Sequence, residues 1–126
     1  MALKFRELAL NLLRIVSGFL FLCHGSQKLF GAFGGQAVPL PTRLGVAGLI
    51  EFFGGLAIMV GIFTRPIAFI AAGEMAVAYW TVHIHMGLVP ITNHGEPAVL
   101  FCFIFLFLAA NGGGRFSLDG KLRQSG

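Results

Sequence analysis

The chain contains four long apolar runs, at about residues 8–24, 44–63, 66–86 and 97–111. A membrane-spanning helix needs about 20 predominantly apolar residues, with about 17 at the lower end. The second and third runs reach that length by themselves, and the first and fourth reach it with flanking residues. Because backbone polar groups inside a bilayer must bond internally, we expect each run to be a helix. The predicted fold is all-α: an integral membrane antiparallel four-helix bundle, with residues 1–126 forming a single membrane domain.

The composition excludes several other classes of protein. Hydrophobic residues make up 56% of the chain and charged residues only 11%, whereas a soluble domain carries about 25% charge. An ordinary soluble enzyme is therefore excluded. The basic residues are scattered at the ends of apolar runs and form no patch, so we expect no nucleic-acid partner. Two cysteines, Cys23 and Cys102, are too few for a disulfide scaffold or a zinc motif, and no metal site is expected.

The connections and the flanking charges predict the topology. Only Thr64 and Arg65 separate the second and third runs, so these two helices must be antiparallel neighbours. Lysine and arginine favour the cytoplasmic side of a membrane. In the predicted topology one side holds Lys4, Arg6, Arg65, Arg115, Lys121 and Arg123, and the other holds Lys28 and Arg43. We therefore expect both termini to be cytoplasmic.

Three ionisable residues, Arg14, Glu51 and Glu74, fall inside the apolar runs. Each is costly to insert unless it is paired. At 1.5 Å per residue, measured from the expected helix ends, all three lie within about one and a half turns of one another in depth. We therefore predict one intramembrane cluster in which Arg14 contacts Glu51, Glu74 or both. The cluster has two interpretations that can coexist: a structural lock for the bundle, or a polar site for a ligand or for protons.

Helical spacing at 100° per residue predicts where a ligand would bind. Glu74 shares a face with Thr81 and His85, Glu51 shares one with Gly55, and His83 lies opposite Glu74. Glycines beside Glu51 leave room for another backbone or a flat ligand. We expect a pocket in the outer half, between the first three spans. Its predicted lining is Glu51, Gly55, Thr81 and His85, topped by His24, Gln27 and Lys28.

Three segments resemble signatures of the DoxX family. These are Arg14 followed by His24-Gly25-Ser26-Gln27-Lys28-Leu29-Phe30-Gly31, then Glu51-Phe52-Phe53-Gly54-Gly55 closing with Gly61-Ile62-Phe63-Thr64-Arg65, and finally Asn111-Gly112-Gly113-Gly114-Arg115-Phe116-Ser117-Leu118-Asp119. The resemblance covers nearly the whole chain in order. It implies a four-helix protein of a prokaryotic plasma (inner) membrane. Members that gave the family its name are small membrane subunits linked to thiosulfate oxidation, with quinone as the acceptor.

The resemblance and the charged cluster together suggest three functions. The first is a membrane subunit associated with a redox system, binding quinone in the outer-half pocket, with no covalently bound cofactor. The second is a non-catalytic accessory or scaffold subunit of a larger membrane complex. The third is a small carrier, which is less favoured because four spans without internal repeats are atypical of transporters. The expected partners are the lipid bilayer and either a larger membrane complex or redox enzyme subunits. The chain is not expected to be an enzyme on its own.

Overall fold

The computed structural model describes residues 2–125, and all of its regular elements over that range are helices. The four long helices are α1 (Ala2–Phe30), α2 (Arg43–Val60), α3 (Thr64–Thr81) and α5 (Glu96–Asn111). Three short elements complete the chain: the 3-10 helix η1 (His83–Met86), α4 (Pro90–Asn93) and α6 (Leu118–Ser125). The prediction of an all-helical membrane bundle is confirmed.

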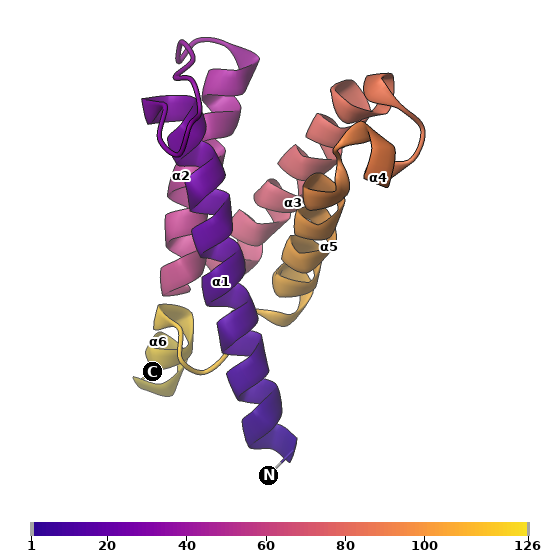
Figure 1. The fold of residues 1–126 in the computed structure, drawn as a ribbon. Helices are drawn as coiled ribbons and strands as arrows, with labels where there is room; N and C mark the ends of the chain where they lie inside the picture. Colours follow the sequence, from indigo (N-terminus) through magenta and orange to yellow (C-terminus); the bar gives the residue numbers. More distant parts are fainter. Residues whose placement is uncertain (1, 126) are drawn as a thin grey trace.

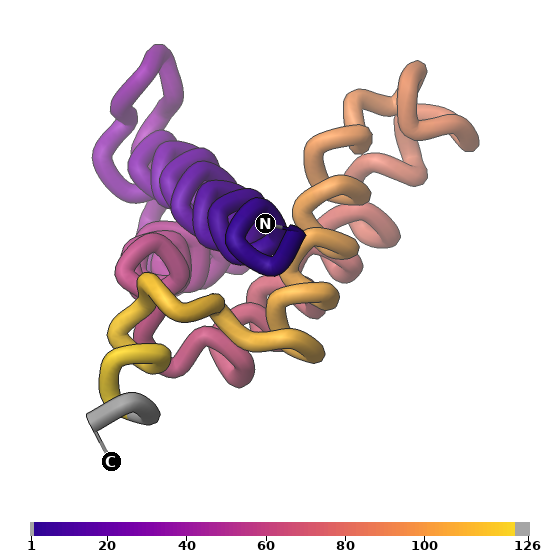
Figure 2. Tube along the Cα trace, turned by 90° about the horizontal axis from the view of Figure 1, so that it is seen from below, coloured from indigo at the N-terminus to yellow at the C-terminus, as the bar shows by residue number. Residues whose placement is uncertain are grey.

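The long helices form two antiparallel pairs that make two arms of the molecule. One arm is α1 with α2, and the other is α3 with α5 (Figures 1 and 2). The arms meet where α2 turns into α3 and diverge toward the opposite end. Three segments are long and apolar enough to cross a membrane: Ala2–Phe30, Arg43–Val60 and Thr64–Met86. The fourth, Glu96–Asn111, is a shorter apolar helix of 16 residues.

The first helix is much longer than the run expected at residues 8–24. It has 29 residues, about 44 Å at 1.5 Å per residue, against a hydrocarbon core of about 30 Å. The polar residues at both of its ends interrupt the apolar pattern without interrupting the backbone hydrogen bonds. The helix ends only where Gly31 takes a positive φ of 71°.

The second and third helices both end earlier than predicted. Gly61 adopts the left-handed conformation (φ 81°) and ends α2 at Val60 instead of residue 63. Asp119 on the tail accepts hydrogen bonds from the backbone N–H groups of Phe63 (2.9 Å) and Thr64 (2.8 Å). These bonds satisfy orphan donors at the start of α3. Helix α3 ends at Thr81, and the chain continues to residue 86 as η1.

The apolar core lies where the two arms meet. Phe21 of α1 contacts Phe105 of α5 edge-on, with ring centroids 4.7 Å apart, and both are fully buried. Phe101 stacks one turn before Phe105 at 5.5 Å. Phe103 and Phe107 are exposed instead. The aromatic residues of α5 therefore divide between the core and the surface.

Candidate functional site

A buried ion pair joins α1 to α2 near the end of the molecule where the arms diverge. The ammonium group of Lys28 donates to Glu51 Oε1 at 2.7 Å. The side chain of Glu51 is 1% exposed, and that of Lys28 is 27% exposed. A buried carboxylate is costly without a partner. The partner of Glu51 is thus Lys28 and not Arg14.

Glycine residues of α1 and α2 bring this ion pair together. A Cβ built on Gly25 would lie 2.3 Å from the backbone nitrogen of Phe52, and one on Gly55 would lie 2.6 Å from the carbonyl oxygen of Gly18. The two backbones are therefore in direct contact, as small residues allow in membranes. Lys28 lies one turn after Gly25 and Glu51 lies next to Phe52, so this contact sets their separation. Gly55 packs against α1 and leaves no room for a ligand, contrary to its predicted place in the pocket.

Glu74 of α3 faces the ion pair from the other arm. The side chains of Glu51 and Glu74 line the same space between the arms. Glu74 Oε1 is buried and has no hydrogen-bond partner among the described residues. The two glutamates of the predicted cluster therefore face one space, and Glu74 Oε1 is left there without a partner in the described chain.

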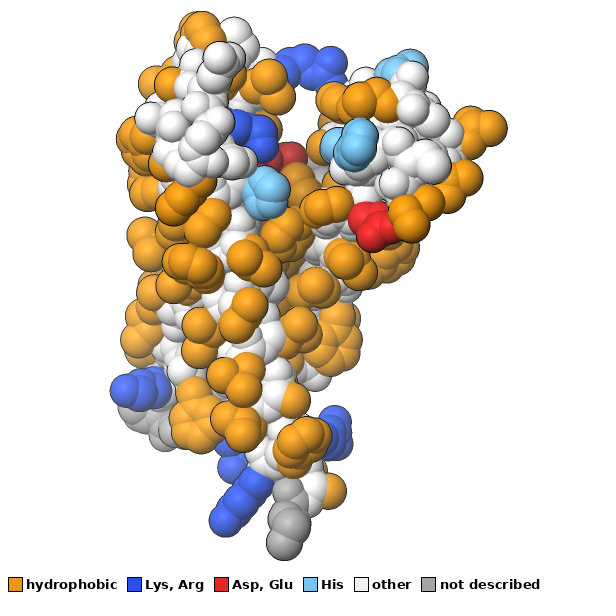
Figure 3. Space-filling view, viewed as in Figure 1, with side chains coloured by type: hydrophobic (Ala, Val, Ile, Leu, Met, Phe, Trp, Pro, Cys, Tyr) orange, Lys and Arg blue, Asp and Glu red, His pale blue; other side chains and the backbone are white. Residues whose placement is uncertain are grey.

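A cavity of about 290 Å³ lies between the two arms at this height. Figure 3 shows basic, acidic and histidine side chains around the hollow between the arms. The polar side chains that line it are Lys28, Glu51, Glu74, His24, His83 and His94. Its apolar walls include Phe21, Met75 and Phe101. The cavity thus combines ionisable groups with aromatic walls, which is typical of a small-molecule site.

The loop between α3 and α5 supplies two histidines that the helical wheel did not select. Helix α3 ends at Thr81, so the 100° rule no longer applies at residues 83 and 85. His83 turns into the cavity, where its Nδ1 lies 3.2 Å from the carbonyl oxygen of Asn93. His85 is exposed on η1 and does not line the cavity. Sequence spacing had predicted the opposite arrangement.

Asn93 holds this loop together through hydrogen bonds, and it was not among the residues predicted from the sequence. It is fully buried. Its amide nitrogen donates to the Tyr79 hydroxyl (3.2 Å) and to the Gly87 carbonyl (3.0 Å), and its Oδ1 accepts from the Gly95 backbone N–H (2.8 Å). An asparagine in a loop commonly bonds neighbouring backbone, but its tertiary partner Tyr79 could not be read from the sequence.

Of the residues predicted to form the pocket, His24, Lys28 and Glu51 line the cavity. Gln27 and Thr81 do not line the cavity, and their side chains bond to backbone carbonyls instead. The Gln27 amide donates to the carbonyl of Phe33 (3.3 Å), and the Thr81 hydroxyl donates to the carbonyl of Val77 (2.7 Å). The cavity therefore lies closer to the loop after α3 than predicted.

Arg14 is separated from the two glutamates, and the prediction that it contacts them is wrong. It is 1% exposed. Its Nη1 donates to Asn11 Oδ1 (2.6 Å) and to the carbonyl of Gly113, and its Nη2 donates to the carbonyl of Met59 at 3.4 Å. Lys28 lies 14 residues further along α1, about 21 Å at 1.5 Å per residue. The predicted depth was wrong because it assumed that the first helix ended near Cys23.

The arrangement around Arg14 fixes the C-terminal tail to the bundle. Gly113 belongs to the tail, and Ser117 of the same segment is 1% exposed. The Ser117 hydroxyl donates to the carbonyl of Gly114 (2.7 Å) and accepts from the Gly120 N–H (3.0 Å). Arg14 thus acts as a clamp for the tail, in place of the predicted lock between Arg14 and the two glutamates.

The two cysteines form no disulfide, and the described residues contain no cluster of metal ligands. Cys23 and Cys102 are free thiols. Within residues 2–125, no three His, Cys, Asp or Glu side chains are grouped in a way that could hold a metal ion.

Comparison with known proteins agrees with the motifs seen in the sequence. The DoxX family model matches residues 9–84, a range that includes Arg14, Lys28, Glu51 and Glu74. A Haemophilus influenzae protein described as "Uncharacterized protein" is 38% identical over 125 residues, covering 94% of this chain and 93% of that protein. The "Inner membrane protein YqjF" of Escherichia coli K12 is 29% identical over 136 residues, covering 96% and 97%. No solved structure matches this chain.

Proposed function

Because the chain belongs to the DoxX family of prokaryotic membrane proteins, we propose that it is an inner-membrane subunit of a redox system and that its cavity binds a quinone headgroup. The observation that carries the proposal is the free acceptor at Glu74 Oε1, which is buried beside the Lys28–Glu51 pair. A buried polar atom without a partner is costly. A ligand that donates a hydrogen bond, such as the hydroxyl of a quinol, would satisfy it.

The chemistry of the cavity lining fits this ligand class. The Lys28 ammonium group is a donor for a quinone carbonyl, and the histidine rings can donate or accept. Phe21 and Phe101 supply an apolar wall, and the His24 ring meets Phe101 edge-on at 5.7 Å. The opening lies between two membrane-spanning arms, so a hydrophobic ligand could enter from the bilayer.

When bound, a quinone would exchange two electrons and two protons with its surroundings. Glu74 would receive or return a proton at Oε1, and the neighbouring Glu51 would pass it on. Lys28 is partly exposed and links Glu51 to the outside of the cavity. Electrons would come from, or go to, a partner protein. A chain that transfers protons while a partner transfers electrons fits a subunit of a redox complex and not an enzyme that acts alone.

Quinone content of the purified protein tests the proposal. The chain is purified from its native membranes, its lipids are extracted, and quinone is counted per chain by mass spectrometry. We expect near-stoichiometric quinone in the unmodified protein. Glu74→Gln, which nearly preserves shape but removes the titrating acceptor, should lower quinone content by about tenfold.

Glu96→Gln is the matched control, because this glutamate is exposed at the start of α5 and does not line the cavity. It should retain quinone. Absence of quinone from the folded wild-type protein, or equal content in Glu74→Gln, would contradict the proposal. Stoichiometric copurification with a larger membrane complex but no quinone would instead support the second candidate, a non-catalytic accessory subunit. The exposed Phe103 and Phe107 of α5 favour that candidate as a docking surface.

A further inference from the structure

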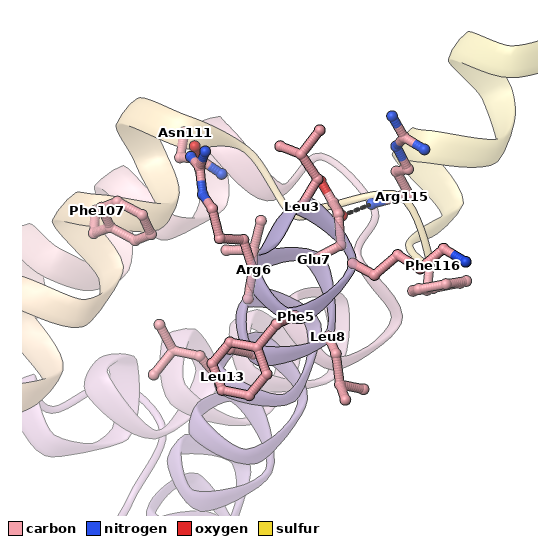
Figure 4. Close-up of a pocket in the computed structure, with 13 residues that line it drawn as sticks. Leu3, Phe5, Arg6, Glu7, Leu8, Leu13, Phe107, Asn111, Arg115 and Phe116 are labelled. Atoms are coloured by element: carbon pink, nitrogen blue, oxygen red, sulfur yellow. Dashed lines mark hydrogen bonds between the residues drawn. The ribbon is translucent and has the colours of Figure 1, made fainter. Parts of the chain in front are cut away.

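A second hollow lies at the opposite end of the molecule from the cavity. It has a volume of about 1150 Å³ and surrounds the first turns of α1 (Figure 4). The end of α5 contributes Phe107 and Asn111, and the tail contributes Arg115 and Phe116. Helix α1 continues past the end of α5 here (Figure 1), and residues of both helices line the groove.

Positive charge predominates in this groove. It is lined by Lys4, Arg6 and Arg115, against one carboxylate, Glu7. Glu7 Oε2 already accepts from the Arg115 backbone N–H (3.0 Å) and from the Asn11 amide (3.3 Å). Within the described part of the chain, the side chains of Lys4, Arg6 and Arg115 make no hydrogen bond or ion pair. Arg6 extends on the α5 side of α1 and Arg115 lies on the side of the tail (Figure 4), so Arg6 is the cation that faces the groove between α1 and α5.

An apolar surface continues from Arg6 into the membrane. Leu10 and Leu13 follow Arg6 at intervals of four and three residues, so the three side chains share one face of α1. Phe107 of α5 borders the same groove and is 51% exposed. Figure 4 shows Arg6 extending from α1 toward Asn111 at the end of α5. Arg6 thus lies at one end of an apolar surface formed by Leu10, Leu13 and Phe107.

We propose that this groove binds an anionic phospholipid. Its phosphate contacts Arg6, its acyl chain lies along Leu10, Leu13 and Phe107, and Lys4 and Arg115 add positive field. A guanidinium group matches phosphate through two parallel hydrogen bonds. Clusters of basic residues at the end of a membrane helix attract anionic headgroups. A lipid is favoured over a free phosphate ion because the apolar face begins directly below the cation.

Native mass spectrometry of the delipidated full chain tests this proposal. The probes are phosphatidylglycerol and phosphatidylcholine with identical acyl chains, added in equal amounts. We expect the wild-type protein to retain phosphatidylglycerol preferentially. Arg6→Gln should lower phosphatidylglycerol binding about fivefold without changing phosphatidylcholine binding, because it removes the charge at the phosphate. Arg6→Lys should keep most of the preference.

Two further variants make the result specific to the groove. Lys121→Gln removes the same charge from an exposed position on α6 that does not line the groove, and it should bind as the wild type does. Arg115→Gln should weaken binding in the same direction as Arg6→Gln and should fold normally, because its side chain bonds to no other described residue. Equal binding of the two lipids would overturn the proposal, as would unchanged binding in both groove variants or an equal loss in Lys121→Gln. A lipid-free dimer that excludes phosphatidylglycerol would identify a second copy as the occupant instead.

Discussion

At the scale of single residues, buried polar groups divide into two sites with different chemistry. Arg14 bonds to two backbone carbonyls and a neutral amide, and although its Nε has no partner among the described residues, Arg14 lines neither of the two hollows described above. Glu74 keeps a buried oxygen without a partner in a cavity. A buried charge that the fold surrounds away from a cavity is typical of a structural role, whereas an unpaired polar atom at a cavity is a functional candidate.

The clamp role of Arg14 predicts the effect of removing its charge. Arg14→Gln should lower the free energy of unfolding by roughly 3 kcal/mol, because hydrogen bonds to Asn11, Gly113 and Met59 are lost in a buried setting. The tail after residue 111 should become accessible to protease before the rest unfolds. Thermal unfolding in detergent and limited proteolysis measure the two effects. Arg43→Gln, an exposed control, should be neutral, and equal stability of both variants would contradict the clamp.

At the scale of elements, close backbone contact between α1 and α2 positions the ion pair. Gly18, Gly25 and Gly55 each leave no space for a Cβ. Their role is packing between helices, which a glycine-rich face in a membrane generally serves. The cavity forms instead between the arms, where α3 and the following loop diverge from α1.

Gly25→Ala tests this packing. Its new methyl group would lie 2.3 Å from the Phe52 nitrogen, so α1 and α2 must separate, and we expect a loss of about 1–3 kcal/mol in stability. Gly73→Ala on α3 is the matched control, because nothing lies within 4 Å of its Cβ position. It should be neutral or slightly stabilising through better helix propensity. Thermal unfolding of both variants in one detergent provides the comparison, and a similar loss at both positions would argue against a specific contact.

At the scale of the whole molecule, the start of α1 and the tail helix α6 lie at the same end (Figure 1). The cavity opens near the other end, where the loop with His83 and His94 is found. The basic residues of the lipid groove and the ionisable residues of the cavity thus lie at opposite ends. The positive-inside rule predicts that the tail is cytoplasmic and that the cavity lies in the outer half.

Cysteine labelling in intact cells tests this topology. In a background with Cys23→Ser and Cys102→Ser, a membrane-impermeant maleimide should label His94→Cys from outside. It should label Lys121→Cys only after the cells are opened. The parental background without either new cysteine controls for other reactions. Labelling of both positions under the same condition would contradict the predicted topology.

The fold class, the helix order and the family can be read from the sequence, because long apolar runs, short connections and glycine motifs are local features of the chain. The sequence also identifies Glu51, Glu74, His24 and Lys28, because ionisable residues are rare in apolar surroundings. Which charges pair depends on the three-dimensional packing. Arg14 and Lys28 lie about 21 Å apart on one uninterrupted helix, and the apolar pattern did not show where that helix ends. The 3-10 turn after Thr81 likewise placed His83 rather than His85 in the cavity, because helical spacing predicts a shared face only while the helix continues.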